Sequence, residues 1–248
     1  METNFYCLIS KLYIQSDIIK ILFFLIIIIN VNAIEVSNED EFKNALNLNS
    51  SNIILKSSFS LDNDYYMLNS KVKSIRIIGS SKNVTLSFKN EFNGLHFNEY
   101  EHVEIENLSI HGNLDIINCT NTNIVNINLY GVLKSDNLNE YQLTISNMNY
   151  KKLQKRMSKN GILIHGGINV IDNSKIYGST TISESIIKIF NLNNKSELSN
   201  NKIKVYIKNS YFSGEFVNCI LEGSYINLKI EDSKFKNGFT FNNGYKHI

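Results

Sequence analysis

The sequence predicts an all-β fold in which short strands stack as the coils of a solenoid. The main observation is a phrase of eight residues that occurs six times between Ile105 and Asn237 of the 248-residue chain. Within each copy, apolar and polar residues alternate with the two-residue period of a β-strand, and the 3.6-residue period of a helix is absent. The copies start 19 to 36 residues apart, which is the spacing of solenoid repeats.

The first 33 residues have the pattern of a signal peptide. Lys11 and Lys20 precede the apolar run Ile21–Ile29, and the small residues of Val31–Ala33 follow it. We expect cleavage after Ala33, so that residues 34–248 form one exported domain that is secreted or held at the cell surface. An uncleaved membrane anchor is the alternative, although nine apolar residues fall short of the ~20 that span a bilayer.

A helix is predicted at about residues 37–47, at the start of the exported domain. Ser37 is the expected N-cap, with Asp40 three residues further on, and Phe42, Ala45 and Leu46 fall on one face. Such a helix would cover the first coil, whose strand edges would otherwise be exposed.

Strand-like segments follow the helix and lead into the repeats. The alternation predicts strands over Asn52–Leu55, Ser74–Gly79, Asn83–Phe88 and Gly94–Phe97, and coils from about residue 50 to residue 241.

The six copies begin at Ile105, Ile124, Ile145, Ile171, Ile207 and Ile230. Their third position is Asn in five copies and Asp232 in the sixth; with 39 Asn in 248 residues, background composition explains this poorly. Asn tolerates the left-handed backbone conformation of a tight bend between two strands, and stacked Asn side chains can bond along the axis. The sixth position holds apolar or aromatic side chains expected in the core: Ile110, Leu129, Tyr150, Ile176, Phe212 and Phe235.

Together, the predicted helix, the SIRIIG strand and the repeated phrase resemble the right-handed parallel β-helix (pectin lyase-like) family. They are most similar to the secreted β-helix repeat proteins of low-GC eukaryotes. The resemblance covers Ile34 to the C-terminus and implies a right-handed parallel β-helix solenoid with an N-terminal capping helix. It implies little about activity, because fold and function separate readily.

The catalytic signatures that the resemblance implies are incomplete in this chain. Polygalacturonase-like members imply NTD, a paired Asp, HG and RIK in that order, whereas this chain has NTN at Asn121–Asn123 and its RI at Arg76, far too early. Pectate lyase-like members imply a catalytic Arg beside calcium ligands, but Arg156 lies in a charged insert. Asp62 and Asp64 begin like a calcium loop that lacks its Gly and terminal Glu, so we expect no metal and no cofactor.

The remaining catalytic candidates are His102, Glu104 and Glu106. They alternate with Val103 and Ile105, so all three are expected on the outer face of one strand. Two carboxylates two residues apart stand ~6.6 Å from each other, close to the roughly 6.5 to 9.5 Å of an inverting glycosidase. Alternating charge on the wet face of a strand is the ordinary alternative, and we favour it. His165, between Ile164 and two glycines, could face a groove or lie simply in a loop.

The expected function is therefore a non-catalytic secreted or cell-surface β-helix protein, structural or binding a carbohydrate or another partner such as a cell-wall glycan. The alternative is an atypical polysaccharide lyase or glycoside hydrolase. A net charge of +2 without a basic stripe excludes nucleic acid as the expected partner. Candidate contacts to sugar faces are Tyr65, Tyr66, Tyr130, Tyr177 and Tyr211.

No disulfide is expected in the exported domain. About four coils separate Cys119 from Cys219, some 19 Å at the ~4.8 Å strand spacing, whereas a disulfide needs Cα atoms within about 7 Å. Asn107, at a predicted bend, is a disfavoured glycan acceptor. The expected acceptors are Asn49, Asn83, Asn118 and Asn194.

The C-terminal stretch GFTFNNGYKHI follows the sixth copy with no segment that could cover the last strands. Two interpretations remain open: self-association through this uncapped coil, or a chain that is a fragment of a longer protein.

Overall fold

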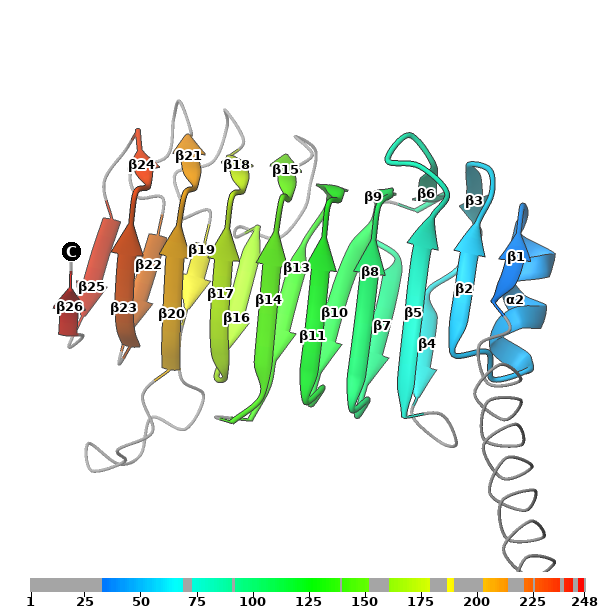
Figure 1. The fold of residues 1–248 in the computed structure, drawn as a ribbon, viewed down its shortest axis with the longest axis horizontal. Helices are drawn as coiled ribbons and strands as arrows, with labels where there is room; N and C mark the ends of the chain where they lie inside the picture. The colour runs from blue at the N-terminus through cyan, green and yellow to red at the C-terminus, as the bar shows by residue number, and fades with distance from the viewer. Residues whose placement is uncertain are drawn as a thin grey trace, which may run out of the picture.

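The structure is a computed structural model that describes residues 33–68, 73–90, 92–138, 140–151, 161–178, 187–189, 203–213, 221–224, 226–236, 239–242 and 245–247. Over these residues the chain winds as a parallel β-helix, and each complete coil adds one strand to each of three parallel sheets. Figure 1 shows the strands stacked side by side in an elongated body, with the helix α2 at its N-terminal end. The predicted fold class is confirmed.

Sheet A is the longest of the three sheets. Its strands are β1 Ile34–Val36, β2 Asn52–Leu55, β5 Ser74–Gly79, β8 His102–Glu106, β11 Asn121–Val125, β14 Gln142–Ser146, β17 Ile168–Asp172, β20 Ile203–Lys208, β23 Ile226–Glu231 and β26 Tyr245–His247. Sheet B follows sheet A across the Asn bend. Its short strands are β3 Phe59–Leu61, β6 Thr85–Phe88, β9 Ser109–His111, β12 Asn128–Tyr130, β15 Asn149–Lys151, β18 Lys175–Tyr177, β21 Tyr211–Ser213 and β24 Lys234–Phe235.

Sheet C completes each coil. Its strands are β4 Tyr65–Leu68, β7 Gly94–Asn98, β10 Asn113–Ile117, β13 Leu133–Asp136, β16 Ile162–His165, β19 Ile187–Ile189, β22 Leu221–Ser224 and β25 Phe239–Asn242. The expected strands of the first coils are present, except that β6 begins at Thr85 rather than Asn83 and β7 extends to Asn98. The strands β1, β3 and β4 were not predicted, because β1 and β3 have only three residues each and the sequence YYML of β4 does not alternate clearly between apolar and polar residues.

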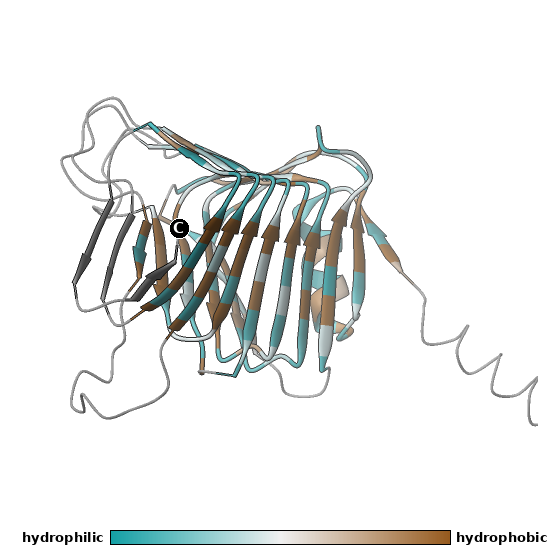
Figure 2. Cartoon of the chain, turned by 60° about the vertical axis from the view of Figure 1, so that its left-hand side comes forward, coloured by the Kyte–Doolittle hydropathy of each residue, from teal (hydrophilic) through white to brown (hydrophobic). Residues whose placement is uncertain are grey.

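The core is a continuous column of apolar side chains inside the coils, and apolar and polar residues alternate along the strands (Figure 2). Ile105 and Ile110 are fully buried, as the repeat predicted. At the sixth position of the repeat the column ends with Phe212 and Phe235, whose rings stack at 4.5 Å. Each fully buried Ile, Leu or Phe side chain of this column contributes about 1.5–3 kcal/mol to the free energy of folding.

The predicted bend between sheets A and B is also confirmed. Asn107, Asn126 and Asn147 have φ values of 59°, 54° and 53°, in the left-handed region. The same conformation recurs at Asn173, Asn209 and Asp232. Asn126 Nδ2 donates to Asn107 Oδ1 at 2.9 Å, and Asn173 Nδ2 donates to Asn147 Oδ1 at 2.6 Å, so amides bond from coil to coil as expected.

A serine ladder beside the Asn bend extends this pattern in the later coils. The hydroxyl of Ser174 accepts from the backbone N–H of Met148 at 3.2 Å, and that of Ser210 accepts from the N–H of Ser174 at 3.1 Å. Ser233 does the same for Ser210 at 3.0 Å. These bonds explain why Ser follows Asn or Asp in the last three copies of the repeat.

The capping helix α2 spans Glu39–Asn47, and its N-cap is Asn38 rather than Ser37. The Asn38 Oδ1 accepts the N–H of Glu41 at 3.0 Å, while Glu41 Oε2 accepts the N–H of Ser37 at 2.6 Å. The sequence-based assignment was wrong by one residue because Glu41, not Asp40, is the acidic partner of this capping arrangement. Phe42 and Ala45 are buried against the first coil, as expected.

None of the helices in the described part of the chain is long and apolar enough to cross a membrane. Of the predicted signal peptide, residues 1–33, only Ala33 is among the described residues. Cleavage after Ala33 stays a prediction.

Candidate functional site

The predicted catalytic candidates lie on the outer face of β8, as their alternation indicated. His102 is exposed, and Glu104 and Glu106 are partly buried. In the neighbouring strand β5, Arg76 is in register with Glu104. Its Nε lies 2.9 Å from Glu104 Oε2 and its Nη2 lies 2.9 Å from Glu106 Oε2. One guanidinium therefore engages both carboxylates.

This arrangement is typical of a surface ion pair between coils rather than of a catalytic pair. The Arg76 side chain is 42% exposed, and exposed pairs of this kind contribute about 0–1 kcal/mol. The sequence did not reveal Arg76 as a partner, because the strands β6 and β7 lie between β5 and β8 in the chain and only the register of β5 with β8 brings the three residues together.

Asp62 and Asp64, considered above as the start of a calcium loop, are both bound by protein groups. Lys89 Nζ lies 2.6 Å from Asp62 Oδ1. The Oδ1 of Asp64 accepts the backbone N–H of Gly94 at 2.7 Å. Over the described ranges, no three His, Cys, Asp or Glu side chains are grouped so that they could hold a metal ion.

Asp64 instead belongs to a cluster that the sequence did not reveal, formed by Asp64, His96 and Asp115 and named here the His96 cluster. His96 Nδ1 lies 2.9 Å from Asp115 Oδ2, and His96 Nε2 lies 3.1 Å from Asp64 Oδ1. The hydrogen bond with Asp115 raises the pKa of His96, burial opposes it, and Asp64 adds to the increase. The Tyr66 ring stacks on the imidazole at 4.3 Å and 10°.

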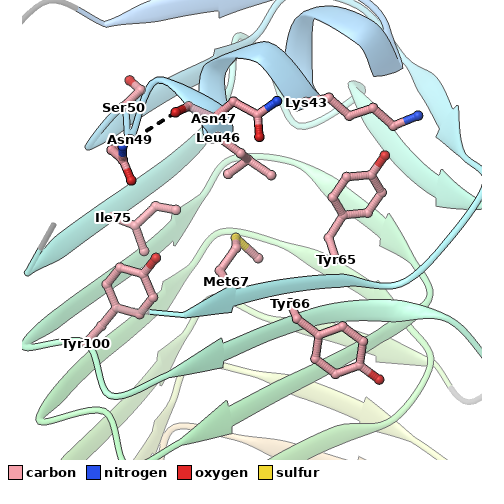
Figure 3. A pocket seen from close by; sticks show the side chains of 10 residues that line it. All are labelled: Lys43, Leu46, Asn47, Asn49, Ser50, Tyr65, Tyr66, Met67, Ile75 and Tyr100. Carbon is pink, nitrogen blue, oxygen red and sulfur yellow. Dashed lines mark hydrogen bonds between the residues drawn. The ribbon is translucent and has the colours of Figure 1, made fainter. Parts of the chain in front are cut away.

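A pocket of about 430 Å³ opens beside this cluster, between the C-terminal end of α2 and the strands β4 and β5. Figure 3 shows Leu46, Met67 and Ile75 converging within it, while Tyr66 points away from the helix at its edge. The lining residues are Lys43, Leu46, Asn47, Asn49, Ser50, Tyr65, Tyr66, Met67, Ile75 and Tyr100.

The five candidate tyrosines divide between two places. Tyr65 and Tyr66 lie at the pocket, whereas the other three lie on sheet B. With His111 they form a group on the outer face that we name the aromatic row: His111, Tyr130 and Tyr177 hold the third position of their strands or the equivalent register, and Tyr211 holds the first position of β21, diagonally beside Tyr177. The rings of His111 and Tyr130 are 4.5 Å apart, and those of Tyr177 and Tyr211 are 6.0 Å apart. His111, Tyr130 and Tyr177 share the seventh position of the repeat, whereas the place of Tyr211 beside Tyr177 comes from the structure.

Lysines accompany the aromatic row. Lys151 is in register with Tyr177, Lys175 is in register with Tyr211, and Tyr211 is in register with Lys234. All three lysines are exposed, and the strands of sheet B as described contain no Asp or Glu. The outer face of sheet B is therefore aromatic and basic, unlike the region of ion pairs around Arg76 on sheet A.

His165 ends β16 and is only 8% exposed. Its Nδ1 lies 3.8 Å from Asp136 Oδ2, and burial lowers the pKa of His165. Gly166 and Gly167 follow with φ values of 86° and 77°, which other residues adopt rarely. His165 therefore packs beside a tight turn.

Three of the four expected glycan acceptors, Asn49, Asn83 and Asn118, are exposed or form exposed turns. The amide of the disfavoured Asn107 donates to the carbonyl of Gly79 at 3.0 Å. Cys119 is a buried free thiol, and burial raises its pKa. The predictions for Asn194, Arg156 and Cys219 lie outside the described residues.

No protein family, no curated protein and no solved structure matches the chain. The class of the protein is therefore defined by its own geometry, which is that of a parallel β-helix.

Proposed function

We propose that this protein is a non-catalytic, exported β-helix protein that binds a linear polysaccharide along the aromatic row of sheet B. In this proposal it is a secreted or cell-surface member of the right-handed parallel β-helix (pectin lyase-like) family. The single observation that carries the proposal is the alignment of aromatic rings and lysines on a face whose described strands carry no acidic residue.

The spacing of the row supports a ligand that lies lengthwise. Neighbouring coils are about 4.8 Å apart, and one strand, β15, separates the strands of Tyr130 and Tyr177. Their rings therefore stand roughly two coils, about 10 Å, apart. Aromatic faces at this distance can stack against separate sugar rings of one extended chain.

The lysines favour a polysaccharide that carries carboxylate or sulfate groups. Lys151 and Lys175 project from adjacent strands of the same face. An ammonium is a compact point charge without the fixed bidentate geometry of Arg, so it suits anionic groups at variable positions along a chain. The strands are held by coil-to-coil hydrogen bonds, so binding needs little ordering of the backbone.

Affinity gel electrophoresis of the purified exported chain tests the proposal, with polygalacturonate, a sulfated galactan and a neutral glucan cast into separate gels. We expect the anionic gels to retard the protein. Removing one stacked ring costs about 0.5–1.5 kcal/mol, so Tyr130→Ala and Tyr177→Ala should each weaken retention by up to about tenfold.

Tyr206→Ala is the matched control, since Tyr206 is a partly exposed tyrosine on sheet A, 37% accessible. It should retain wild-type retardation. Equal loss in all three variants, or no retardation by any polysaccharide, would contradict the proposal. Product release from the same polymers that disappears in Glu104→Gln would instead support the enzymatic alternative.

A further inference from the structure

We propose that the polysaccharide bound by the aromatic row is an alternating copolymer, in which an uncharged sugar and a sugar with one anionic group follow each other in turn. This inference rests on the function proposed above and adds the class of ligand. It is carried by the register of aromatic rings and lysines on the outer face of sheet B, where rings and ammonium groups alternate from coil to coil.

The third-position column consists of Tyr130, Lys151 and Tyr177, which end the strands β12, β15 and β18. Leu129 is in register with Tyr150, and the next residues, Tyr130 and Lys151, continue this register. Lys151 is in turn in register with Tyr177. The single strand between the two tyrosines therefore places an ammonium group in line with their rings.

The first-position column consists of Lys175, Tyr211 and Lys234, which begin the strands β18, β21 and β24. Lys175 is in register with Tyr211, and Tyr211 is in register with Lys234. The order is again an alternation at steps of one coil, here ammonium, ring, ammonium. Because both columns alternate, the pattern belongs to the face and not to one pair of residues.

The step of the register matches the length of one sugar. Neighbouring coils are about 4.8 Å apart, and one pyranose of an extended polysaccharide advances the chain by a similar length. A chain that lies along the third-position column would thus place one sugar over each of its three strands. The first and third sugars would lie on Tyr130 and Tyr177, and the sugar between them would lie beside Lys151.

The charges of the column favour an uncharged sugar over the rings. The face of an aromatic ring carries partial negative charge, which disfavours a carboxylate or sulfate held against it. The strand of Tyr130 contains no charged residue, so an anionic group placed there would lose water without gaining a cation from that strand. An anionic group on the next sugar instead meets the exposed Lys151, whose flexible stem reaches different positions on that sugar.

The alternation begins at Tyr130. His111 lies one coil earlier, in register with Tyr130, and its ring is 4.5 Å from the tyrosine ring. Burial lowers the pKa of His111, so its imidazole is uncharged at neutral pH. His111 therefore adds aromatic surface to the column and no charge.

Two polymers that share one backbone test the inference. Unsulfated chondroitin carries one carboxylate on every second sugar, whereas chondroitin 4-sulfate carries an anionic group on every sugar. Fluorescence anisotropy of end-labelled oligosaccharides of equal length gives the Kd of each for the exported chain, at about 0.15 M salt to screen long-range attraction. We expect the Kd of unsulfated chondroitin to be about two- to fivefold lower. Charge attraction alone predicts the opposite order, so an equal or lower Kd for chondroitin 4-sulfate overturns the alternating ligand.

Two variants locate the alternation in the third-position column. Lys151→Met removes the ammonium group but keeps a long side chain, and it should weaken the binding of unsulfated chondroitin by up to about fivefold. Tyr130→Lys replaces a ring by a charge, so it should move the preference towards chondroitin 4-sulfate, a gain that misfolding does not produce. An unchanged ratio of the two Kd values in Tyr130→Lys would contradict the uncharged sugar at this coil. Lys204→Met removes an exposed lysine of sheet A and should leave the ratio as in the wild type.

The result for the alternating ligand is separate from the result for the proposed function. Binding of both oligosaccharides without the expected preference overturns the alternation and leaves polysaccharide binding by the aromatic row in place. If neither oligosaccharide binds, the alternating ligand is wrong, and the gels described above decide whether the face binds any polysaccharide.

Discussion

At the scale of single residues, the bend between sheets A and B depends on the special backbone tolerance of Asn. Asn126 adopts a φ of 54° and donates its amide to Asn107. A residue with an ordinary Cβ costs roughly 1–2 kcal/mol in this conformation, and the amide bond contributes about 0.5–1.5 kcal/mol. The repeat therefore retains Asn for two separable reasons.

Substitutions at Asn126 separate the two contributions. Asn126→Ala loses both the backbone tolerance and the amide bond, so its free energy of unfolding should fall by about 2–3 kcal/mol. Asn126→Gly keeps the backbone tolerance and should lose less. Urea unfolding of both variants measures the difference, and equal destabilisation would show that backbone conformation contributes nothing at this bend.

At the scale of elements, α2 is tied to the first coil by a buried aromatic contact and by Glu39. The Phe42 ring packs edge-on against Tyr65 at 5.6 Å. Glu39 Oε1 accepts from the Tyr65 hydroxyl at 2.6 Å and from the backbone N–H of Asp62 at 3.1 Å. Burial acts to raise the pKa of Glu39, but these bonds and Lys43 together lower it from 4.5 to about 2.

The lowered pKa of Glu39 predicts that α2 stabilises the folded protein less as the pH becomes acidic. Because the pKa of Glu39 is lower in the folded protein, its contribution is fully present above about pH 4.5 and is lost as pH falls towards about 2. Glu39→Gln should lower the free energy of unfolding at neutral pH by about 1–3 kcal/mol. It should also reduce the loss of that free energy as the pH falls from about 4.5 to about 2. Urea unfolding across this pH range measures both effects.

Glu35→Gln provides the control, since Glu35 is an exposed carboxylate paired with Lys56 alone among its described contacts. Glu35→Gln should show the same decrease in the free energy of unfolding at acidic pH as the wild type. An identical profile for the two variants would contradict the role of Glu39.

At the scale of the whole molecule, the coils expose some Asn side chains and bind others within the ladder. If the chain is exported after cleavage at Ala33, glycosylation should follow this pattern. Glycopeptide mapping of protein secreted from a eukaryotic host should find a mature N-terminus at Ile34 and glycans at Asn83 and Asn118. Occupancy at Asn107 would contradict the hydrogen bond that Asn107 makes with Gly79.

Much of the fold could be predicted from the sequence, because its signals are local. Alternation placed Ile105 in the core, and Asn107 at the bend follows from the conformational preference of one residue type. The N-cap was misplaced by one residue because Ser37, Asn38, Asp40 and Glu41 offer two overlapping capping patterns. Helix boundaries are known to shift by a residue or two for this reason.

The sequence by itself determined the stacked coils, the interior column and the bends, because these follow from periodicity and from backbone preference. Only the tertiary structure decided which side chains meet across coils. Arg76 meets Glu104 and Glu106, His96 meets Asp64 and Asp115, and Tyr211 meets Tyr177, although a coil or more of chain separates the partners. Their contacts depend on strand register, which is set when the coils stack and not by any local stretch of the chain.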